Sequence, residues 1–247
     1  MRCNGRMQNL PQPSNHSPAE IEKFDSLEQL WWDPAGTMGT LHTINPLRLG
    51  IITRALGPAP STLLDAGCGG GILAEPLARL GYQVTGSDLS ERAIGVARQH
   101  AAQHGAQVTY LLEGTESLAA RLPASFDAVT CLEMLEHVPD PASVVRACAS
   151  LLRPGGKAFF SSIDRSWLAG LLVIFGGEYV LRLLPRGSHQ YKMLVRPAEL
   201  RGWAESAGLR FTGQASLAYN PFLGRFTVRQ GIARLNYMIW FQKPAKP

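Results

Sequence analysis

From Thr62 onward, short apolar runs alternate with stretches of helical periodicity, and this alternation constrains the fold more than any other feature of the chain. Such an alternation is typical of an α/β protein, in which a mostly parallel sheet carries helices on both faces. We predict five strands, at 62–65, 83–87, 107–112, 128–131 and 157–161, and four helices between them, at 71–80, 90–104, 115–122 and 141–152.

Both ends of the chain extend this repeating unit. After a helix at 197–207, two strand-like runs, 209–217 and 234–240, are joined by a loop that contains Pro and Gly. We expect this pair to add an antiparallel edge, which makes seven strands in all. Two further helices, 19–32 and 46–56, are predicted upstream.

The length favours one domain. A chain of 247 residues with 45% hydrophobic side chains can bury a large single core. We predict that residues 19–247 form this domain, with N-terminal helices in 19–57 and an insertion at 165–192. Residues 1–18 read as a disordered leader, with an organelle-targeting peptide as the alternative.

Composition excludes several classes of protein. The four cysteines, Cys3, Cys68, Cys131 and Cys148, include no C-x-x-C pair, which argues against a disulfide framework and a thiolate zinc site and favours a reducing compartment. No apolar run is long enough to span a bilayer.

A glycine-rich loop follows the first predicted strand. It reads Asp65-Ala-Gly67-Cys-Gly69-Gly-Gly71, and a predicted helix begins at once. Glycines allow a tight turn and let a ligand approach the backbone, while the start of a helix offers unpaired N–H groups. The window 69–74 also matches G-x-G-x-x-A, so the glycines alone fit a dinucleotide or another adenosine-containing ligand.

Two carboxylates refine this prediction. Asp88, at the end of the second strand, is placed to accept hydrogen bonds from ribose hydroxyls. Asp65, just before the glycines, would repel a pyrophosphate but would attract the ammonium group of a methionine moiety. Asp88 fits either ligand, whereas Asp65 favours a cofactor with a methionine moiety, such as S-adenosylmethionine, over a dinucleotide.

The motifs resemble those of a known superfamily and, within it, of one family. The glycine loop, Asp88 and Leu152-Arg-Pro-Gly155-Gly156 are similar to the motifs of class I S-adenosylmethionine-dependent methyltransferases, which have a Rossmann-like fold. Over residues 20–240 the chain resembles the ubiquinone-biosynthesis O-methyltransferases. That resemblance rests on Trp31-Trp-Asp33, Leu41-His42, Ile44-Asn-Pro-Leu-Arg48-Leu, Glu133-Met-Leu-Glu136-His137-Val-Pro-Asp140-Pro, Glu178-Tyr179 with Leu181-Arg182, and Tyr219-Asn-Pro221. Members of this family methylate hydroxyls of polyprenylated catechols and of demethylubiquinol.

The resemblance implies which residues bind the cofactor. Contacts to S-adenosylmethionine are implied at Arg48, Gly67, Asp88 and Leu132, and the loop glycines Gly69 and Gly71 belong to the same site. Many relatives have methionine at the position of Leu132. The guanidinium of Arg48 could also form a bidentate contact with the carboxylate of the cofactor. Glu113 and Thr115 are placed to face the adenine.

A second cluster, Glu133, Glu136 and His137, follows the fourth strand at the edge where such sheets bind ligands. If the segment is helical, Glu133 shares one face with the other two. Two carboxylates and an imidazole suit Mg²⁺, with Mn²⁺ or Zn²⁺ as alternatives, and the resemblance implies a divalent ion here too. His137 could instead be a general base, because phenolic hydroxyls titrate near pH 10. Alternatively, the two glutamates cap a helix and His137 packs against it.

The insertion and the basic half of the chain point to a membrane surface. Residues after 149 carry 14 of the 24 basic side chains and 4 of the 19 acidic ones. A short apolar stretch, 167–177, has cationic flanks, as in a helix that lies on anionic lipid, although a lid over the substrate fits equally. We expect a cytoplasmic, peripherally membrane-associated bacterial protein, or one on the matrix side of the mitochondrial inner membrane. Other ubiquinone-biosynthesis proteins are implied as partners.

Three other functions fit parts of the sequence. A dehydrogenase would share the glycine loop but would require a group for hydride transfer. A lipid- or nucleic-acid-binding protein would use the basic half, but no nucleic-acid motif is recognisable, so nucleic acid is not expected as a partner. The remaining alternative is an O-methyltransferase that acts on a soluble catechol.

Overall fold

A computed structural model describes residues 15–25, 30–58, 61–165, 193–220, 225–231 and 236–245. The predicted insertion therefore lies outside the described residues apart from Arg165, as do residues 1–14 of the predicted leader. Within the described residues, no helix is long and apolar enough to cross a membrane.

One sheet organises the described part of the chain, and it contains eight strands in the order β3-β2-β1-β4-β5-β8-β6-β7. The first five strands of this order are parallel, and β8, β6 and β7 continue the sheet in antiparallel pairs. The strands are β1 Thr62–Ala66, β2 Gln83–Asp88, β3 Val108–Leu112, β4 Phe126–Leu132, β5 Leu152–Ile163, β6 Arg210–Asn220, β7 Arg225–Gln230 and β8 Asn236–Gln242. The α/β class, the mostly parallel sheet and its antiparallel edge are confirmed.

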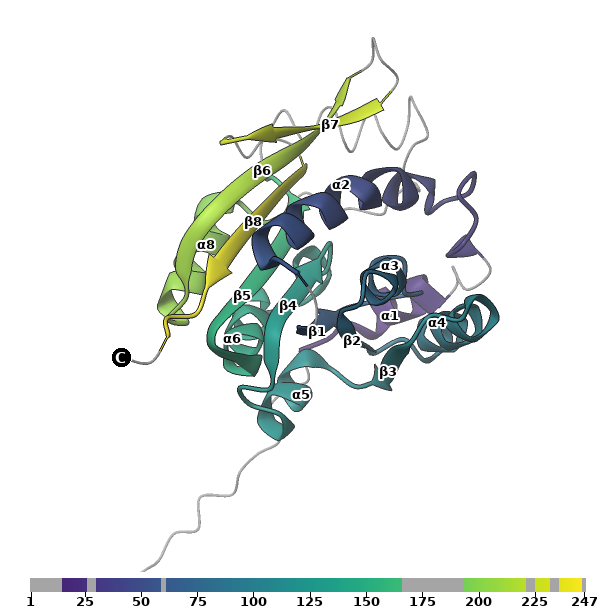
Figure 1. Ribbon diagram of the computed structural model, residues 1–247, viewed down its shortest axis with the longest axis horizontal. Coiled ribbons are helices and arrows are strands. Elements are labelled where there is room, and N and C mark those ends of the chain that lie inside the picture. The colour runs from purple at the N-terminus through teal and green to yellow at the C-terminus, as the bar shows by residue number, and fades with distance from the viewer. Residues whose placement is uncertain are drawn as a thin grey trace, which may run out of the picture.

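Helices cover both faces of the sheet (Figure 1). On one face, α5, α6 and α8 pack on β4, β5 and β8 around Leu118, Val144 and Leu200. On the other, α2, α3 and α4 pack on β1, β2 and β5. The helices are α1 Pro18–Asp25, α2 Gly39–Leu56, α3 Ala74–Arg79, α4 Glu91–His104, α5 Thr115–Arg121, α6 Pro141–Leu151 and α8 Pro197–Ser206, with a 3₁₀ helix, η2, at Leu135–His137. The central strands are buried on both sides, as in other covered parallel sheets.

Local sequence explains where two helices begin. Ser90 caps α4 by accepting a hydrogen bond from the amide of Ala93 at 3.0 Å. Asp140 caps α6 in the same way, accepting from Ser143 at 3.1 Å, and Pro141 stands at the first helical position. Both arrangements satisfy amide groups that the helix itself leaves unpaired.

The predicted strand count and three predicted helix boundaries are wrong. The strand count is eight rather than seven, because Arg225–Gln230 forms an additional edge strand. Its side chains are mostly exposed and do not show the hydrophobic pattern of a buried strand. Helix α2 begins at Gly39, seven residues before Pro46, although proline favours helix starts. Helix α1 ends at Asp25, before Trp32, and α3 begins only at Ala74, because the glycine loop continues to Leu73.

Candidate active site

The glycine loop crosses the carboxyl end of β1 in a conformation that requires glycine. Gly67, Gly69 and Gly71 have φ angles of +71°, +51° and +86°, in the left-handed region. A Cβ on Gly67 would lie 2.7 Å from Sδ of Met134, and one on Gly71 would lie 2.3 Å from the hydroxyl of Tyr110. The loop is therefore fixed by close packing as well as by backbone freedom.

Asp88 ties β2 to this loop. One carboxylate oxygen accepts a hydrogen bond from the amide of Gly69 at 2.9 Å, and the other accepts from the amide of Ser90 at 2.9 Å. Burial raises the pKa of Asp88, and the two amide donors oppose this effect. Asp88 lines the pocket in front of the loop, where the sequence predicts the ribose.

Asp65 lies at the other side of the loop, at the end of β1. Its side chain is 3% exposed, and it accepts a hydrogen bond from the hydroxyl of Thr130 at 2.7 Å. Burial raises its pKa to about 7, and the hydrogen bond from Thr130 opposes that shift. A cation bound near Asp65 would favour its ionised form.

Arg48 and Glu133 form a buried ion pair between α2 and the end of β4. Arg48 is 5% exposed, and its Nε has no hydrogen-bond partner among the described residues. Oε1 of Glu133 also accepts from the hydroxyl of Ser161 at 2.7 Å and from the side-chain Nδ2 of Asn236 at 3.2 Å. The ion pair thus joins the predicted cofactor site to the predicted catalytic cluster.

Glu136 and His137 point to different partners. Glu136 is 4% exposed and accepts from the hydroxyl of Ser162 at 3.0 Å. Burial raises its pKa to about 8, and the charge of Glu133 adds to the shift. His137 is hydrogen-bonded through Nδ1 to Glu20 on α1 at 2.7 Å, and the ring of Phe24 meets it edge-on.

One pocket connects these groups. Its described lining includes Gly67, Gly69, Asp88 and Leu132 from the predicted cofactor site, and Glu133 and His137 from the predicted catalytic cluster. Glu113 and Thr115, predicted to face the adenine, line it too. Arg48, Asp65, Gly71 and Glu136 are not among the described lining residues. The pocket thus runs from the glycine loop to Glu133 and His137 of the predicted catalytic cluster.

Comparison with known proteins decides the family. A family model described as a methyltransferase domain matches residues 41–213. A ubiquinone biosynthesis O-methyltransferase of Ralstonia nicotianae is 50% identical over 234 residues, which cover 95% of this chain and 98% of the relative. Another from Methylococcus capsulatus is 49% identical, with 92% and 95% covered. This chain belongs to the ubiquinone biosynthesis O-methyltransferases.

Solved structures agree on the fold. A magnesium protoporphyrin IX methyltransferase from Synechocystis, with bound S-adenosylhomocysteine, gives a TM-score of 0.66 at 21% identity and covers 90% of this chain and 94% of its own. A methyltransferase of Thermotoga maritima, titled a possible histamine N-methyltransferase, gives 0.65 at 21% identity, with 91% and 98% covered. The Rossmann-like class I methyltransferase fold is confirmed.

Family and fold together establish the activity. Like other ubiquinone biosynthesis O-methyltransferases, this enzyme is an S-adenosylmethionine-dependent O-methyltransferase, and S-adenosylmethionine is its co-substrate. A dehydrogenase and a non-enzymatic binding protein are therefore excluded as the function of this chain.

The three predicted metal ligands are not assembled as a set. Glu133 is outside any helix, with a φ of +52°, and the 3₁₀ helix covers only Leu135–His137, so the predicted shared helical face is wrong. Burial and the charge of Glu133 raise the pKa of Glu136, but His137 is hydrogen-bonded to Glu20 instead. Within the described residues, no group of three or more His, Cys, Asp or Glu side chains is arranged to hold a metal ion. As they lie, the three side chains do not fit one shared ion.

Two elements, α1 and β8, contribute to the site although the sequence did not predict it. Glu20, Ile21 and Phe24 of α1 line the pocket, although the family model begins only at residue 41. Asn236, the first residue of β8, holds Glu133 from the antiparallel part of the sheet. Glu20, Ile21 and Phe24 share one face of a helix, and this spacing is a pattern from which the contribution of α1 to the pocket could have been predicted. No pattern in the neighbouring sequence indicates a role for Asn236.

Proposed function

We propose that this enzyme methylates ring hydroxyls of polyprenylated intermediates of ubiquinone synthesis, of the 2-polyprenyl-6-hydroxyphenol and 3-demethylubiquinol types. The observation that carries this proposal is identity of 46–50% with ubiquinone biosynthesis O-methyltransferases over more than 90% of both chains. The geometry supports it, because one pocket reaches from the glycine loop to His137 and Glu133.

The proposed mechanism gives each group one task. Asp88 receives the ribose of S-adenosylmethionine, Asp65 provides a negative charge for its cationic end, and Gly67 and Gly69 leave room for it. A phenolic hydroxyl near pH 7 must lose its proton before it attacks the methyl group. His137 takes that proton, and Glu20 orients its ring by accepting from Nδ1–H, which leaves the lone pair on Nε2. The phenolate oxygen then attacks the methyl carbon in line with the C–S bond. The O–C bond forms as the C–S bond breaks, and S-adenosylhomocysteine leaves.

The divalent ion expected at Glu133, Glu136 and His137 has no step in this mechanism. Each side chain is held by a different partner, namely Arg48, Ser162 and Glu20. Mg²⁺, Mn²⁺ or Zn²⁺ would therefore require these contacts to rearrange.

The proposal places the enzyme at a membrane surface, because a polyprenyl substrate resides in lipid. The predicted contact is the insertion at 165–192, which lies outside the described residues apart from Arg165. Cytoplasmic location with peripheral attachment, and association with other ubiquinone-biosynthesis proteins, belong to the same proposal. Flotation with anionic vesicles tests the attachment: variants Leu172→Asp and Phe175→Asp should lose binding, and equal binding by variant and wild type would refute it.

The activity is tested with defined acceptors. The enzyme is incubated with S-adenosylmethionine and either a short-chain prenylated catechol or a short-chain demethylubiquinol, with and without Mg²⁺, and products are followed by mass spectrometry. We expect a mass gain of one methyl group on each prenylated acceptor. Faster methylation of a soluble catechol than of both prenylated acceptors would contradict the proposal. Product that forms only with Mg²⁺ would show that the ion rearranges the contacts of Glu133 and Glu136.

A further inference from the structure

Two consecutive tryptophans, Trp31 and Trp32, contact the glycine loop, although they lie before the part of the chain that the family model matches. The ring of Trp31 covers the loop so closely that a Cβ on Gly69 would lie 2.2 Å from its Cη2, and one on Gly70 would lie 2.6 Å from its Cγ. Trp31 belongs to the described lining of the pocket, and Trp32 does not.

Trp32 makes a directed contact with the loop. Its indole N–H donates a hydrogen bond to the carbonyl of Gly70 at 2.9 Å. The next amide, that of Gly71, donates to the carbonyl of Cys68 at 3.0 Å. Both polar groups of the peptide between Gly70 and Gly71 are therefore held, and that peptide cannot rotate without breaking a hydrogen bond.

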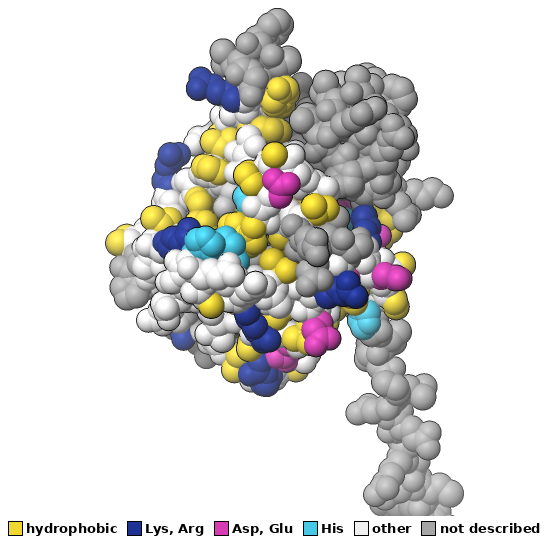
Figure 2. Space-filling model, turned by 90° about the vertical axis from the view of Figure 1, so that its right-hand side faces the viewer, with side chains coloured by type: hydrophobic (Ala, Val, Ile, Leu, Met, Phe, Trp, Pro, Cys, Tyr) yellow, Lys and Arg dark blue, Asp and Glu magenta, His cyan; other side chains and the backbone are white. Residues whose placement is uncertain are grey.

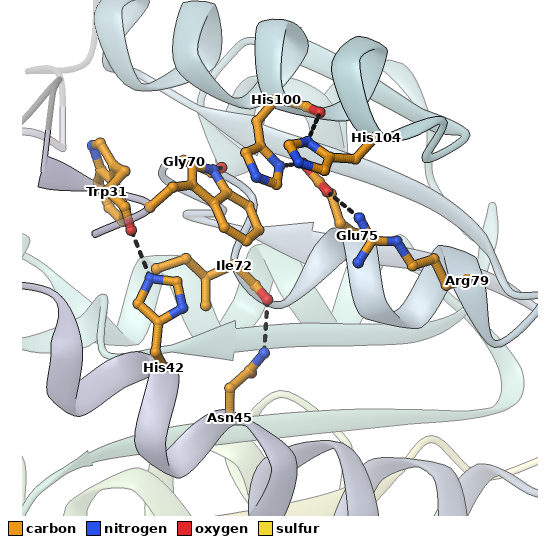
Figure 3. A network of polar contacts seen from close by, with 10 residues as sticks. Trp31, His42, Asn45, Gly70, Ile72, Glu75, Arg79, His100 and His104 are labelled. Atoms are coloured by element: carbon orange, nitrogen blue, oxygen red, sulfur yellow. Dashed lines mark hydrogen bonds and ion pairs between the residues drawn. The ribbon is translucent and has the colours of Figure 1, made fainter. Parts of the chain in front are cut away.

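The ring of Trp32 is itself fixed by a histidine. His100 of α4 stacks on it with ring centroids 3.5 Å apart and an angle of 2° between the planes. Nδ1 of His100 is hydrogen-bonded to Glu75 at 2.8 Å, and Arg79 pairs with the second oxygen of Glu75 at 3.1 Å (Figure 3). His100 and the exposed His104 stack with ring centroids 3.9 Å apart. Figure 2 shows histidine and basic side chains side by side on one face of the molecule.

Glu75 connects these contacts back to the loop. It lies in the first turn of α3, directly after the loop, and its amide donates to the carbonyl of Gly71 at 3.1 Å. Its side chain is 0% exposed, and a carboxylate is costly to bury unless partners hold it in place. The contacts from Gly70 through Trp32 and His100 to Glu75 therefore form a closed ring of interactions around the loop, which we call the loop brace.

We propose that Trp32 is a positioning residue for S-adenosylmethionine, and that the loop brace fixes the glycine loop in the conformation that receives the cofactor. Glycine-rich backbone loses more conformational freedom on ordering than other backbone does. A loop that is ordered before binding avoids that loss at the moment of binding, and this increases affinity. The brace acts from behind the loop, without touching the cofactor itself.

Calorimetry of S-adenosylhomocysteine binding to the full chain tests the proposal. Trp32→Phe keeps an aromatic ring against His100 but loses the N–H, and we expect its affinity to fall about fivefold. The matched control is Trp203→Phe, on α8 at the opposite face of the sheet, which should bind as the wild type does. In turnover assays, KM for S-adenosylmethionine should rise in Trp32→Phe, while KM for the acceptor stays unchanged.

A second pair of variants separates positioning from stability. Glu75→Gln can still accept the hydrogen bond from His100 and should bind S-adenosylhomocysteine nearly as tightly as the wild type, whereas Glu75→Leu should weaken binding as Trp32→Phe does. Melting temperatures identify variants that are destabilised as a whole. Wild-type affinity in Trp32→Phe, or an equal loss in the Trp203→Phe control, would overturn the proposal.

Discussion

The ion pair between Arg48 and Glu133 is the residue-scale feature that joins binding to chemistry. Glu133 accepts hydrogen bonds from α2, β5 and β8, namely from Arg48, the hydroxyl of Ser161 and the side-chain Nδ2 of Asn236. It does so in a left-handed backbone conformation that is costly for a residue with a side chain. The contacts of its carboxylate offset this local cost.

Glu133→Gln should therefore be strongly destabilising. The substitution leaves the buried guanidinium of Arg48 without its counter-charge, and we expect the free energy of unfolding to fall by about 3 kcal/mol. Urea denaturation measures this change. The matched control is Glu113→Gln, which breaks a pair with the half-exposed Arg121 and should change stability little. Equal effects in the two variants would contradict the assignment of a buried pair.

The contact between Glu20 and His137 should affect turnover rather than cofactor binding. Glu20→Gln removes the charge that orients the imidazole and stabilises its protonated form, and kcat should fall about tenfold. Affinity for S-adenosylhomocysteine should stay unchanged. Glu22→Gln, exposed on the same helix, is the control and should behave as the wild type does. An unchanged kcat in Glu20→Gln would remove Glu20 from the mechanism.

At the scale of residues, the positions of the site residues could be predicted from the sequence more readily than the contacts between them. The glycine loop, Asp88 and the cluster at 133–137 could be predicted because each follows directly after a strand at one edge of the sheet. The pairing of Arg48 with Glu133 and that of His137 with Glu20 could not, since these contacts join residues 85 and 117 positions apart. No local pattern encodes such contacts.

At the scale of elements, α1 and the residues just before it line the pocket and are attached at several points. Asn15 donates to Glu116 at 2.6 Å and accepts from the amide of Asp140 at 2.7 Å. At the other end, Asp25 accepts from the hydroxyl of Ser90, the residue that caps α4. No side chain of α1 is fully buried, so these polar contacts contribute much of its attachment.

Ser90→Ala should loosen two helices at once. It removes the cap of α4, which costs about 1 kcal/mol of stability, and it also removes the contact that holds Asp25. Hydrogen exchange should speed up in α1 as well as in the first turn of α4. Ser90→Asn restores a capping side chain and should return both towards the wild-type rate. Faster exchange in α4 alone would show that Asp25 does not depend on Ser90.

The fold was predictable where elements are buried, and less so where they are exposed. The five parallel strands were found because each is a compact apolar run in a sheet covered on both sides. Strand β7 could not be predicted, since its side chains, Arg225 to Gln230, are mostly exposed and lack the pattern of a buried strand. Helix α2 was cut short at Pro46 because proline is favoured at helix starts, whereas here it lies inside the helix.

At the scale of the whole molecule, the buried carboxylates set how stability depends on pH. Burial raises the pKa of Asp65 to about 7 and that of Glu136 to about 8, from ordinary values of 3.8 and 4.5. Between the ordinary and the raised values, the folded state holds protons that the unfolded state has released. Stability is therefore fully present below about pH 4 for these groups and is lost as the pH rises through 7 and 8. Under the proposed mechanism, cofactor binding has the opposite preference, because a cationic ligand favours ionised Asp65.

Asp65→Asn separates these two effects. Without an ionisable group at this position, the free protein should gain on the order of 2 kcal/mol at pH 8 relative to the wild type, and little at pH 5. Affinity for S-adenosylmethionine should fall, because the cationic end of the cofactor loses its counter-charge. Urea denaturation at the two pH values and calorimetry measure these changes. Asp127→Asn is the control: its hydrogen bonds and its pairing with Arg153 lower the pKa of Asp127, so its effect should be equal at pH 5 and pH 8. A stability change in Asp65→Asn that is the same at both pH values would show that Asp65 is ionised in the free protein throughout this range.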